Sequence, residues 1–92
     1  MKNKIVAVVV TYNRKDMLKE CITALLNQAY HDLDIMVIDN CSTDGTINLV
    51  KNINDSRVIY INTGENLGGA GGFQFGIREA LERHYEYLWL MD

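Results

Sequence analysis

An apolar run that stops abruptly at a carboxylate constrains the fold of this chain more than any other feature. The run covers residues 35–38, reaches Asp39 and passes into the small, mostly polar residues 40–46. Apolar residues then return at helical spacing, at Ile47, Leu49, Val50 and Ile53. A buried strand followed by a loop and a helix start gives this pattern, with Asp39 at the carboxyl end of the strand.

The position of Asp39 allows two interpretations. In open α/β sheets, ligands bind beside the carboxyl ends of strands, where a carboxylate can accept the imide N–H of a uracil, thymine or guanine ring. Alternatively, Asp39 caps its own loop by accepting hydrogen bonds from nearby backbone N–H groups, as Asp often does. This stretch alone favours neither interpretation.

The rest of the chain repeats the alternation of strand and helix. Residues 5–10 are continuously apolar and mostly β-branched, which is typical of a parallel strand covered on both faces. An amphipathic helix is expected next, with Asn13 as its N-cap and its end near residues 27–29. Short loops and right-handed crossovers place such strands in one sheet between helices. The remaining elements are expected as strands at 58–61 and 87–91 and as helices at about 44–52 and after the glycines of 64–72.

Glycine is concentrated in one segment, because five of the seven glycines lie between Gly64 and Gly72. The segment fits neither a P-loop nor the G-x-G-x-x-G dinucleotide fingerprint. Each glycine costs a helix roughly 1 kcal/mol relative to alanine, so several at a helix start indicate a backbone that something approaches closely. A ligand and the neighbouring strand both satisfy that need, and the ligand is favoured. The helix face expected to be apolar carries Ala70, Phe73, Ile77, Ala80, Leu81 and His84.

Charge and composition disfavour several classes of function. The 92 residues carry a formal net charge of −3 without a basic block, which argues against nucleic-acid binding. No apolar run is long enough to span a membrane or to form the core of a signal peptide, so a cytoplasmic protein is expected. Cys21 and Cys41 lack the spacing of a zinc site.

A strand order of 3-2-1-4 places a crevice between the first and fourth strands, at the point where the order reverses. The residues expected at its mouth are Thr11, Tyr12, Asn13, Asp39, Asn66 and Asp92. The two acids would repel each other and a phosphate unless a divalent cation binds there. Mg²⁺ and Mn²⁺ favour such oxygen ligands together with substrate phosphates.

The last apolar segment, residues 87–91, is followed only by Asp92. Natural domains seldom end on so apolar a strand, so residues 1–92 are expected to be one domain from the N-terminal part of a longer protein. Unpaired apolar edges invite pairing with another chain. Self-association through this strand is therefore expected, most simply as a homodimer.

Four motifs stand out along the chain: V-V-T-Y-N-R at 9–14, I-D-N-C-S-T-D-G-T at 38–46, N-L-G-G-A-G-G-F at 66–73 and L-W-L-M-D at 88–92. Together they resemble the N-terminal half of family-two glycosyltransferases with the GT-A fold, in family order and spacing over essentially the whole chain. The glycine-rich motif looks most like the rhamnosyltransferase and galactofuranosyltransferase branch. The resemblance implies a three-layer α/β/α, Rossmann-like fold with a mostly parallel four-stranded sheet in the order 3-2-1-4.

The resemblance also implies how the first half of the chain binds a nucleotide-sugar donor. Thr11 and Tyr12 match the segment that lies against the base of the donor, with Asn13 and Arg14 beside it. Asp39 matches the carboxylate that accepts the pyrimidine N3–H.

In the second half, Asn66 and the glycines after it, among them Gly69, match the loop that flanks the donor pocket. Asp92 matches the first acid of the Asp-x-Asp motif, which contacts the donor ribose and the shell of a Mg²⁺ or Mn²⁺ ion. The other acids of that motif, the acceptor-binding half and the general base are missing from these residues. Little or no transfer activity is therefore expected from them alone.

The implied reaction is an inverting transfer from a UDP- or dTDP-linked sugar to a saccharide or lipid-linked saccharide acceptor in cell-surface polysaccharide synthesis. It would take place in the cytoplasm, at the inner face of the membrane, with the metal as Lewis acid for the leaving nucleoside diphosphate. A phospho-receiver domain is disfavoured, because residues 11–13 lack the acidic pair it needs. A non-catalytic nucleotide-binding or assembly module of doubly wound fold stays open.

Overall fold

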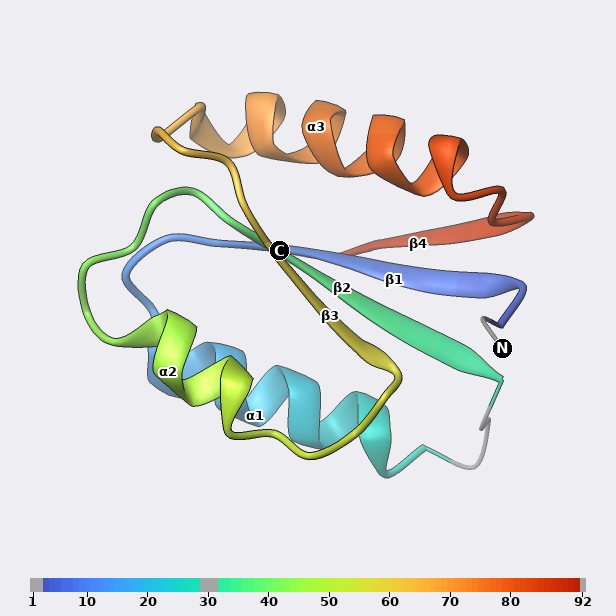
Figure 1. Ribbon diagram of the computed structural model, residues 1–92, viewed down its shortest axis with the longest axis horizontal. Coiled ribbons are helices and arrows are strands. Elements are labelled where there is room, and N and C mark those ends of the chain that lie inside the picture. Colours follow the sequence, from blue (N-terminus) through green and yellow to red (C-terminus); the bar gives the residue numbers. More distant parts are fainter. Residues whose placement is uncertain (1–2, 29–31, 92) are drawn as a thin grey trace.

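The computed structural model describes residues 3–28 and 32–91 of the chain. Strands and helices alternate through these ranges, as predicted (Figure 1). In chain order they are β1 (Ile5–Thr11), α1 (Lys15–Leu26), β2 (Leu33–Asp39), α2 (Thr46–Lys51), β3 (Val58–Asn62), α3 (Gly68–Glu82) and β4 (Tyr87–Met91). None of the helices within these ranges has the length and apolarity needed to cross a membrane.

One sheet contains these four strands, all parallel, in the order β3-β2-β1-β4. This arrangement confirms the predicted α/β class and strand order. The register places Thr11, Asp39 and Asn62 side by side, so β1, β2 and β3 end together. β4 pairs with the other edge of β1 only as far as Val9, which lies opposite Met91. Among the described residues, the last two residues of β1 have no partner in β4.

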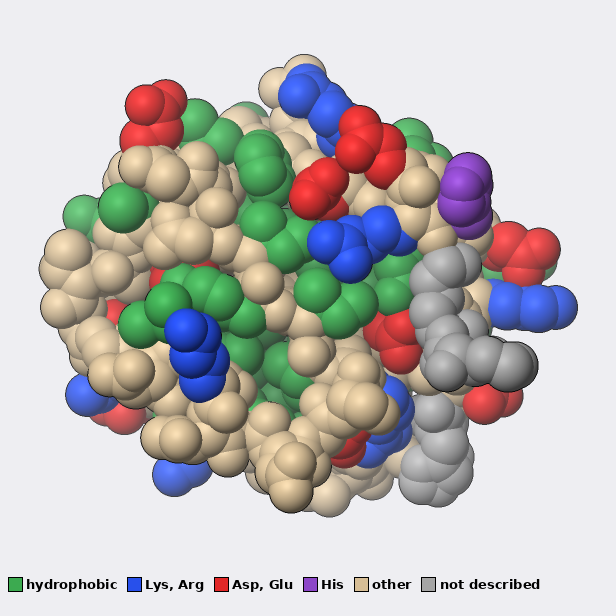
Figure 2. Space-filling view, in the orientation of Figure 1, with side chains coloured by type: hydrophobic (Ala, Val, Ile, Leu, Met, Phe, Trp, Pro, Cys, Tyr) green, Lys and Arg blue, Asp and Glu red, His purple; other side chains and the backbone are tan. Residues whose placement is uncertain are grey.

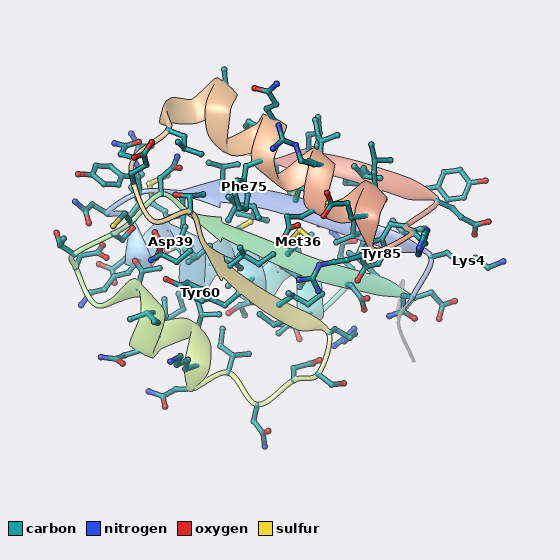
Figure 3. The ribbon with its side chains drawn as sticks, turned by 45° about the horizontal axis from the view of Figure 1, so that its top comes forward. Lys4, Met36, Asp39, Tyr60, Phe75 and Tyr85 are labelled. Carbon is teal, nitrogen blue, oxygen red and sulfur yellow. The ribbon has the colours of Figure 1, made fainter. Side chains whose placement is uncertain are left out.

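The core fills both faces of the sheet, because β1 and β2 are mainly apolar on both sides. Figure 1 shows α1 and α2 on one face and α3 on the other, which completes the three predicted layers. Under α1 and α2 the buried residues are Ala7, Val9, Leu18, Ile22, Leu25, Leu33, Ile35, Val37 and Val50. Under α3 they are Val6, Val8, Met36, Ile38, Ala80 and Tyr85, with Phe75 packed against them (Figure 3).

The outer strand β3 receives less cover from α3, which packs mainly on β1 and β2. Ile59 and Ile61 of β3 are only partly buried against the cluster under α3. Hydrophobic side chains accordingly remain visible between α3 and β3 in the space-filling view (Figure 2). Charged side chains of both signs lie around them.

Helix α3 approaches the sheet more closely than ordinary side chains would permit. Its buried residues are Gly72, Gly76 and Ala80, and only Ala80 belongs to the predicted apolar face. A Cβ atom on Gly76 would lie 2.5 Å from Val8 Cγ1, and one on Gly72 would lie 2.6 Å from Val10 Cγ1. The neighbouring strand thus requires these two glycines. The interpretation that a ligand requires the glycine cluster is therefore wrong for Gly72. The predicted apolar face of this helix is also wrong, because the buried face is the one that contains Gly72, Gly76 and Ala80.

A backbone N–H group at the N-terminus of α1 donates a hydrogen bond to a residue from a distant loop. Lys15 N donates to Asp44 Oδ2 at 3.1 Å, and the residue at the N-cap position makes no side-chain cap hydrogen bond. Asn13 has a positive φ of 49° and accepts a hydrogen bond from Thr43 N at Oδ1, 2.7 Å away. The predicted Asn13 cap is therefore wrong. α1 ends at Leu26, just before its predicted end, of which residue 29 lies outside the described residues.

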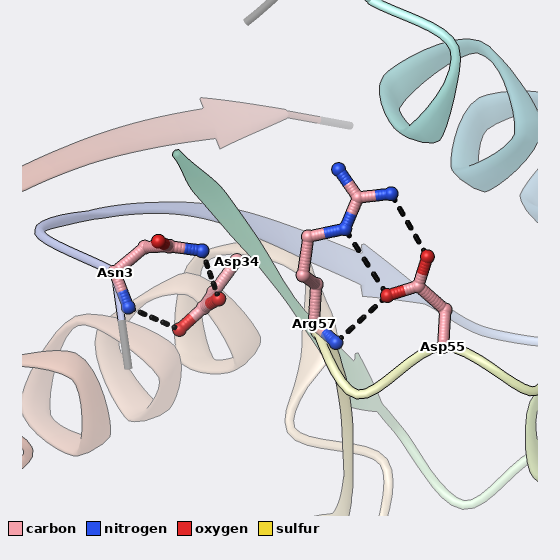
Figure 4. Close-up of polar contacts among 4 residues, drawn as sticks. All are labelled: Asn3, Asp34, Asp55 and Arg57. Carbon is pink, nitrogen blue, oxygen red and sulfur yellow. Dashed lines mark hydrogen bonds and ion pairs between the residues drawn. The ribbon is translucent and has the colours of Figure 1, made fainter. Parts of the chain in front are cut away.

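The end of the sheet at which the strands begin contains a buried carboxylate, that of Asp34 in β2. It accepts hydrogen bonds from Asn3 N at 3.2 Å and Asn3 Nδ2 at 2.9 Å (Figure 4). The Tyr85 hydroxyl also donates to Asp34, at 2.5 Å, and burial together with this hydrogen bond raises the pKa of Tyr85. Nearby, Arg57 and Asp55 form an ion pair at 2.8 Å (Figure 4). The contacts of Asp34 join β2 to the segments that precede β1 and follow α3.

Strand β4 forms an edge of the sheet and exposes much of its apolar surface. Tyr87 is 64% exposed, Leu90 is 53% exposed and Trp89 is 42% exposed. The homodimer expected through this strand remains a prediction.

Candidate functional site

Asp39 lies at the carboxyl end of β2 and is fully buried. Its Oδ1 accepts a hydrogen bond from Ser42 N at 2.9 Å, and its Oδ2 accepts one from the Tyr60 hydroxyl at 2.6 Å. The bond from Ser42 is the loop-capping contact considered from the sequence. Each carboxylate oxygen has two acceptor positions, so both oxygens retain capacity for one further donor.

Tyr60 is a site residue that sequence reasoning missed. It points from β3 toward Asp39 on the neighbouring strand (Figure 3). Its oxygen in turn accepts a hydrogen bond from Asn62 Nδ2 at 3.2 Å. Burial, with the hydrogen bond to Asp39, raises the pKa of Tyr60 to about 12, so the phenol stays protonated at neutral pH. The available signal was alternation: Tyr60 and Asn62 are two residues apart, so their side chains share one face of the strand.

Asn40 is a second residue that sequence reasoning missed, because only its place in a motif was noted. Its side chain is buried and joins the end of β2 to the glycine-rich segment. Asn40 Nδ2 donates to Gly68 O at 3.0 Å, and Asn40 Oδ1 accepts from Leu67 N and from Thr63 Oγ1, each at 3.3 Å. One amide side chain thus fixes the position of the loop that begins α3.

Two loops are joined beside Asp39 by contacts at the surface. Asn13 N donates to Ser42 Oγ at 2.8 Å, and Thr43 N donates back to Asn13 Oδ1 at 2.7 Å. Asn13 therefore lies beside the Asp39 loop, and its side chain is engaged with that loop. Cys41, which lies in this loop, has a positive φ of 66°.

A cavity of about 760 Å³ opens at the carboxyl end of β1. Its volume is in the range of small-molecule sites. Of the predicted binding residues, its lining includes Thr11, Tyr12, Arg14, Asn66 and Gly69. Its apolar lining includes Val9, Val10, Met17, Leu18 and Phe73. Of the other predicted residues, Asn13 and Asp39 lie outside the lining of this cavity, and Asp92 lies outside the described residues.

The cavity has the groups that a nucleotide needs. The ring of Tyr12, a residue that is 44% exposed, is available for stacking on a base. Arg14 offers a guanidinium that can bind phosphate. The first N–H groups of a helix lack intrahelical partners and favour anions, and the start of α3 lines the cavity at Gly69. A Cβ atom on Gly69 would meet no atom within 4 Å, so this part of the backbone is open to a ligand.

The fit of the chain to a divalent cation depends on its carboxylates. Within residues 3–28 and 32–91, no three or more His, Cys, Asp and Glu side chains gather in a group that could hold a metal. The described residues therefore do not make a metal site by themselves. The predicted ligand Asp92 is not among them.

Comparison with known proteins gives a consistent result. The model of the family described as glycosyl transferase family 2 matches residues 6–92. A glucosyltransferase of Escherichia coli, UDP-Glc:alpha-D-GlcNAc-diphosphoundecaprenol beta-1,3-glucosyltransferase WfaP, is 31% identical over 81 residues, which are 88% of this chain and 32% of the relative. The galactofuranosyltransferase GlfT1 of Mycobacterium tuberculosis is 34% identical over 94 aligned residues, which cover 100% of this chain and 31% of the relative. The chain thus spans about a third of the length of these relatives.

One solved structure is similar over most of the chain. It is a mannosyltransferase from Pyrobaculum calidifontis in complex with GDP-Man and Mn²⁺. The TM-score is 0.74 at 26% sequence identity, and the match covers 87% of this chain and 25% of the mannosyltransferase.

Proposed function

The chain belongs to glycosyl transferase family 2, and we propose that residues 1–92 form the nucleotide-sugar-binding domain of a longer glycosyltransferase, as part of its N-terminal half. One observation carries this proposal. The cavity at the carboxyl end of β1 gathers an aromatic ring from Tyr12, a guanidinium from Arg14 and the open backbone at Gly69, on a family-matched fold. These are groups for a base, a phosphate and a closely approaching sugar diphosphate.

The proposed donor is a UDP- or dTDP-linked sugar. Tyr12 and Thr11 would lie against its base, Asn13 and Arg14 would lie beside them, and Asp39 would accept the ring N–H. Asn66 and Gly69 would flank the rest of the donor. The name of the E. coli relative, which specifies UDP-Glc, supports a uridine nucleotide.

We propose Mg²⁺ or Mn²⁺ as the ion that accompanies the donor, with Asp92 as its ligand from this chain. Support comes from the archaeal mannosyltransferase, whose complex contains Mn²⁺, and from the preference of both ions for carboxylate and phosphate oxygens. When bound, the ion would neutralise charge on the departing diphosphate.

The proposed reaction is an inverting hexosyl transfer to a saccharide or lipid-linked saccharide in cell-surface polysaccharide synthesis. The E. coli relative is named for a diphosphoundecaprenol-linked acceptor, which supports a lipid-linked acceptor. The proposed place of the reaction is the cytoplasm, at the inner face of the membrane. The acceptor site and general base would come from sequence beyond these residues. A nucleotide-binding or assembly module without chemistry is the second candidate, because the described residues present a cavity with groups for a nucleotide but do not make a metal site by themselves.

Titration calorimetry of the chain with UDP and dTDP, with and without Mn²⁺, tests the proposal. Binding that strengthens with Mn²⁺ is expected. ADP is the matched control, because it carries the same diphosphate as UDP and dTDP but a base without a ring imide. Equal binding of ADP, or no binding of either pyrimidine nucleotide, would reject a donor site of this kind.

A further inference from the structure

The loop after β1 is bonded to the loop after β2 at alternate residues. Asn40 N donates to Thr11 O at 2.9 Å, which continues the pairing of the two strands one residue past the end of β2. Two residues further along the first loop, Asn13 N donates to Ser42 Oγ at 2.8 Å, and Asn13 Oδ1 accepts from Thr43 N at 2.7 Å. Side-chain oxygens thus take over from backbone carbonyls where the strands end.

A carboxylate makes the next bond, two residues after Asn13. Asp44 Oδ2 accepts from Lys15 N at 3.1 Å, and Asp44 Oδ1 accepts from Thr46 N at 3.2 Å and from the Thr46 hydroxyl at 2.5 Å. The hydrogen bond from the Thr46 hydroxyl, together with those from backbone N–H groups, lowers the pKa of Asp44. The carboxylate therefore stays charged at neutral pH and keeps the start of α1 beside the start of α2.

The residues between these bonds line the cavity at the carboxyl end of β1. Tyr12 and Arg14 belong to its lining, whereas Asn13 and Lys15 do not. Toward the described residues, neither the Tyr12 hydroxyl nor the Arg14 guanidinium makes a hydrogen bond or an ion pair. The places of these two side chains therefore depend on the backbone that the neighbouring bonds hold.

The backbone at this point adopts a conformation that needs support. Asn13 has a positive φ of 49°, and Cys41, which precedes Ser42, has one of 66°. Non-glycine residues in the left-handed region persist only where the surrounding structure holds them. The bonds of Asn13 to Ser42 and Thr43 provide that support. These three residues lie outside the lining of the cavity, so a nucleotide bound there does not have to displace the bonds.

We propose that Asn13 and Ser42 are positioning residues of the donor site, which hold Tyr12 and Arg14 in place for the nucleotide without lining the cavity themselves. Their role rests on the proposed function, in which Tyr12 contacts the base and Arg14 a phosphate. A loop that is already ordered loses less conformational freedom when the ligand binds, and this raises affinity. The hydrogen bonds between the two loops therefore act on affinity through Tyr12 and Arg14.

Ser42→Ala is the most conservative test, because it removes one oxygen, the acceptor of Asn13 N. Ser56→Ala is the matched control, since Ser56 is an exposed serine in the turn before β3, at the opposite end of the sheet. Dissociation constants of UDP with Mn²⁺ are measured by calorimetry. Ser42→Ala is expected to weaken binding about three- to tenfold, as for the loss of one hydrogen bond, and Ser56→Ala to stay within about twofold of the parent. Equal affinities of the two variants would overturn the inference.

Asn13→Gly is the second variant, and it carries the test if Ser42→Ala does not fold. Glycine adopts a positive φ freely, so the change removes the acceptor of Thr43 N without forcing the backbone into another conformation. The same change is also made in Arg14→Gln. Because Asn13 acts through Arg14, the fold loss in UDP affinity should be smaller in that background than in the parent. Equal fold losses in both backgrounds would mean that Asn13 supports the domain in general and does not position Arg14.

The order of the loop is also measured without a ligand, by NMR relaxation of backbone N–H groups. In the parent, Tyr12 and Arg14 should have order parameters of about 0.85, the value of a rigid backbone, and both variants should lower them. Low values in the parent, or unchanged values in the variants, would refute the positioning role while leaving the nucleotide site intact. A parent that binds neither UDP nor dTDP would instead remove the proposed function and this inference with it.

Discussion

Replacing Gly76 by alanine should destabilise the fold, although alanine is the better helix former. The added Cβ would lie 2.5 Å from Val8 Cγ1 and 3.0 Å from Ile38 Cγ1. Both neighbours are fully buried, branched side chains in the two central strands, and they have no free space to enter. Overpacking of this kind costs about 1–3 kcal/mol, and the gain in helix propensity offsets about 1 kcal/mol. The expected net loss is about 1 kcal/mol.

Gly69→Ala is the matched control, because it makes the same chemical change in the same helix where no atom lies within 4 Å of the added Cβ. The propensity gain largely cancels between the two variants, so their difference isolates the steric cost of about 1–3 kcal/mol. Urea unfolding followed by circular dichroism gives both free energies, and each 1 kcal/mol corresponds to a shift of about 4–8 °C in Tm for a domain of this size. If Gly76→Ala is as stable as Gly69→Ala, the close approach of α3 to the sheet does not depend on glycine.

The other predictions concern the site and the edge strand. Asp39→Ala should weaken UDP binding by about 1.5–3 kcal/mol without unfolding the domain, and equal calorimetric affinities of variant and parent would contradict its role. The pKa of Tyr60 is raised to about 12 in the folded state, against about 10 in an unfolded chain, so its contribution to stability is complete below pH 10 and is lost as the pH rises toward 12; thermal melts of the parent and Tyr60→Phe should converge over that interval. Asn40→Ala removes the partners of Leu67 N and Gly68 O, and faster amide hydrogen exchange at Leu67 is expected by NMR. Sedimentation at micromolar concentration should show self-association that Trp89→Glu abolishes, whereas a monomeric parent would contradict pairing through β4.

The arrangement of strands could be predicted because it depends on local patterns. The β-branched run of residues 5–10 and the apolar run ending at Asp39 each identify a buried parallel strand. The length of the third connection then places β4 beside β1. The prediction held because right-handed crossovers leave few alternatives for such a sequence.

The hydrogen-bond partners could not be predicted, because they join segments that are distant in sequence. The sequence around Asn13 is typical of a local helix cap, but its side chain bonds to a loop about thirty residues away. Asp44 of that loop accepts the hydrogen bond from the backbone N–H of Lys15 at the start of the helix. The partnership of Tyr60 with Asp39 likewise depends on the register of two strands. Glycine spacing did contain the packing face of α3, since Gly72, Gly76 and Ala80 recur every four residues, but a search for apolar side chains overlooks it.

The pairing of β4 with β1 has a consequence for the order in which the protein is completed during synthesis. β1 is translated well before its partner β4, since Ile5 pairs with Tyr87. Domains generally fold as units during synthesis, so β1, β2 and β3 become part of a complete sheet only after β4 has left the ribosome. One edge of the central strand must wait for β4, and closing so long a loop is slow. The nascent chain therefore carries an unpaired β1 edge until residues 87–91 have been translated, which is the interval in which a chaperone could bind it.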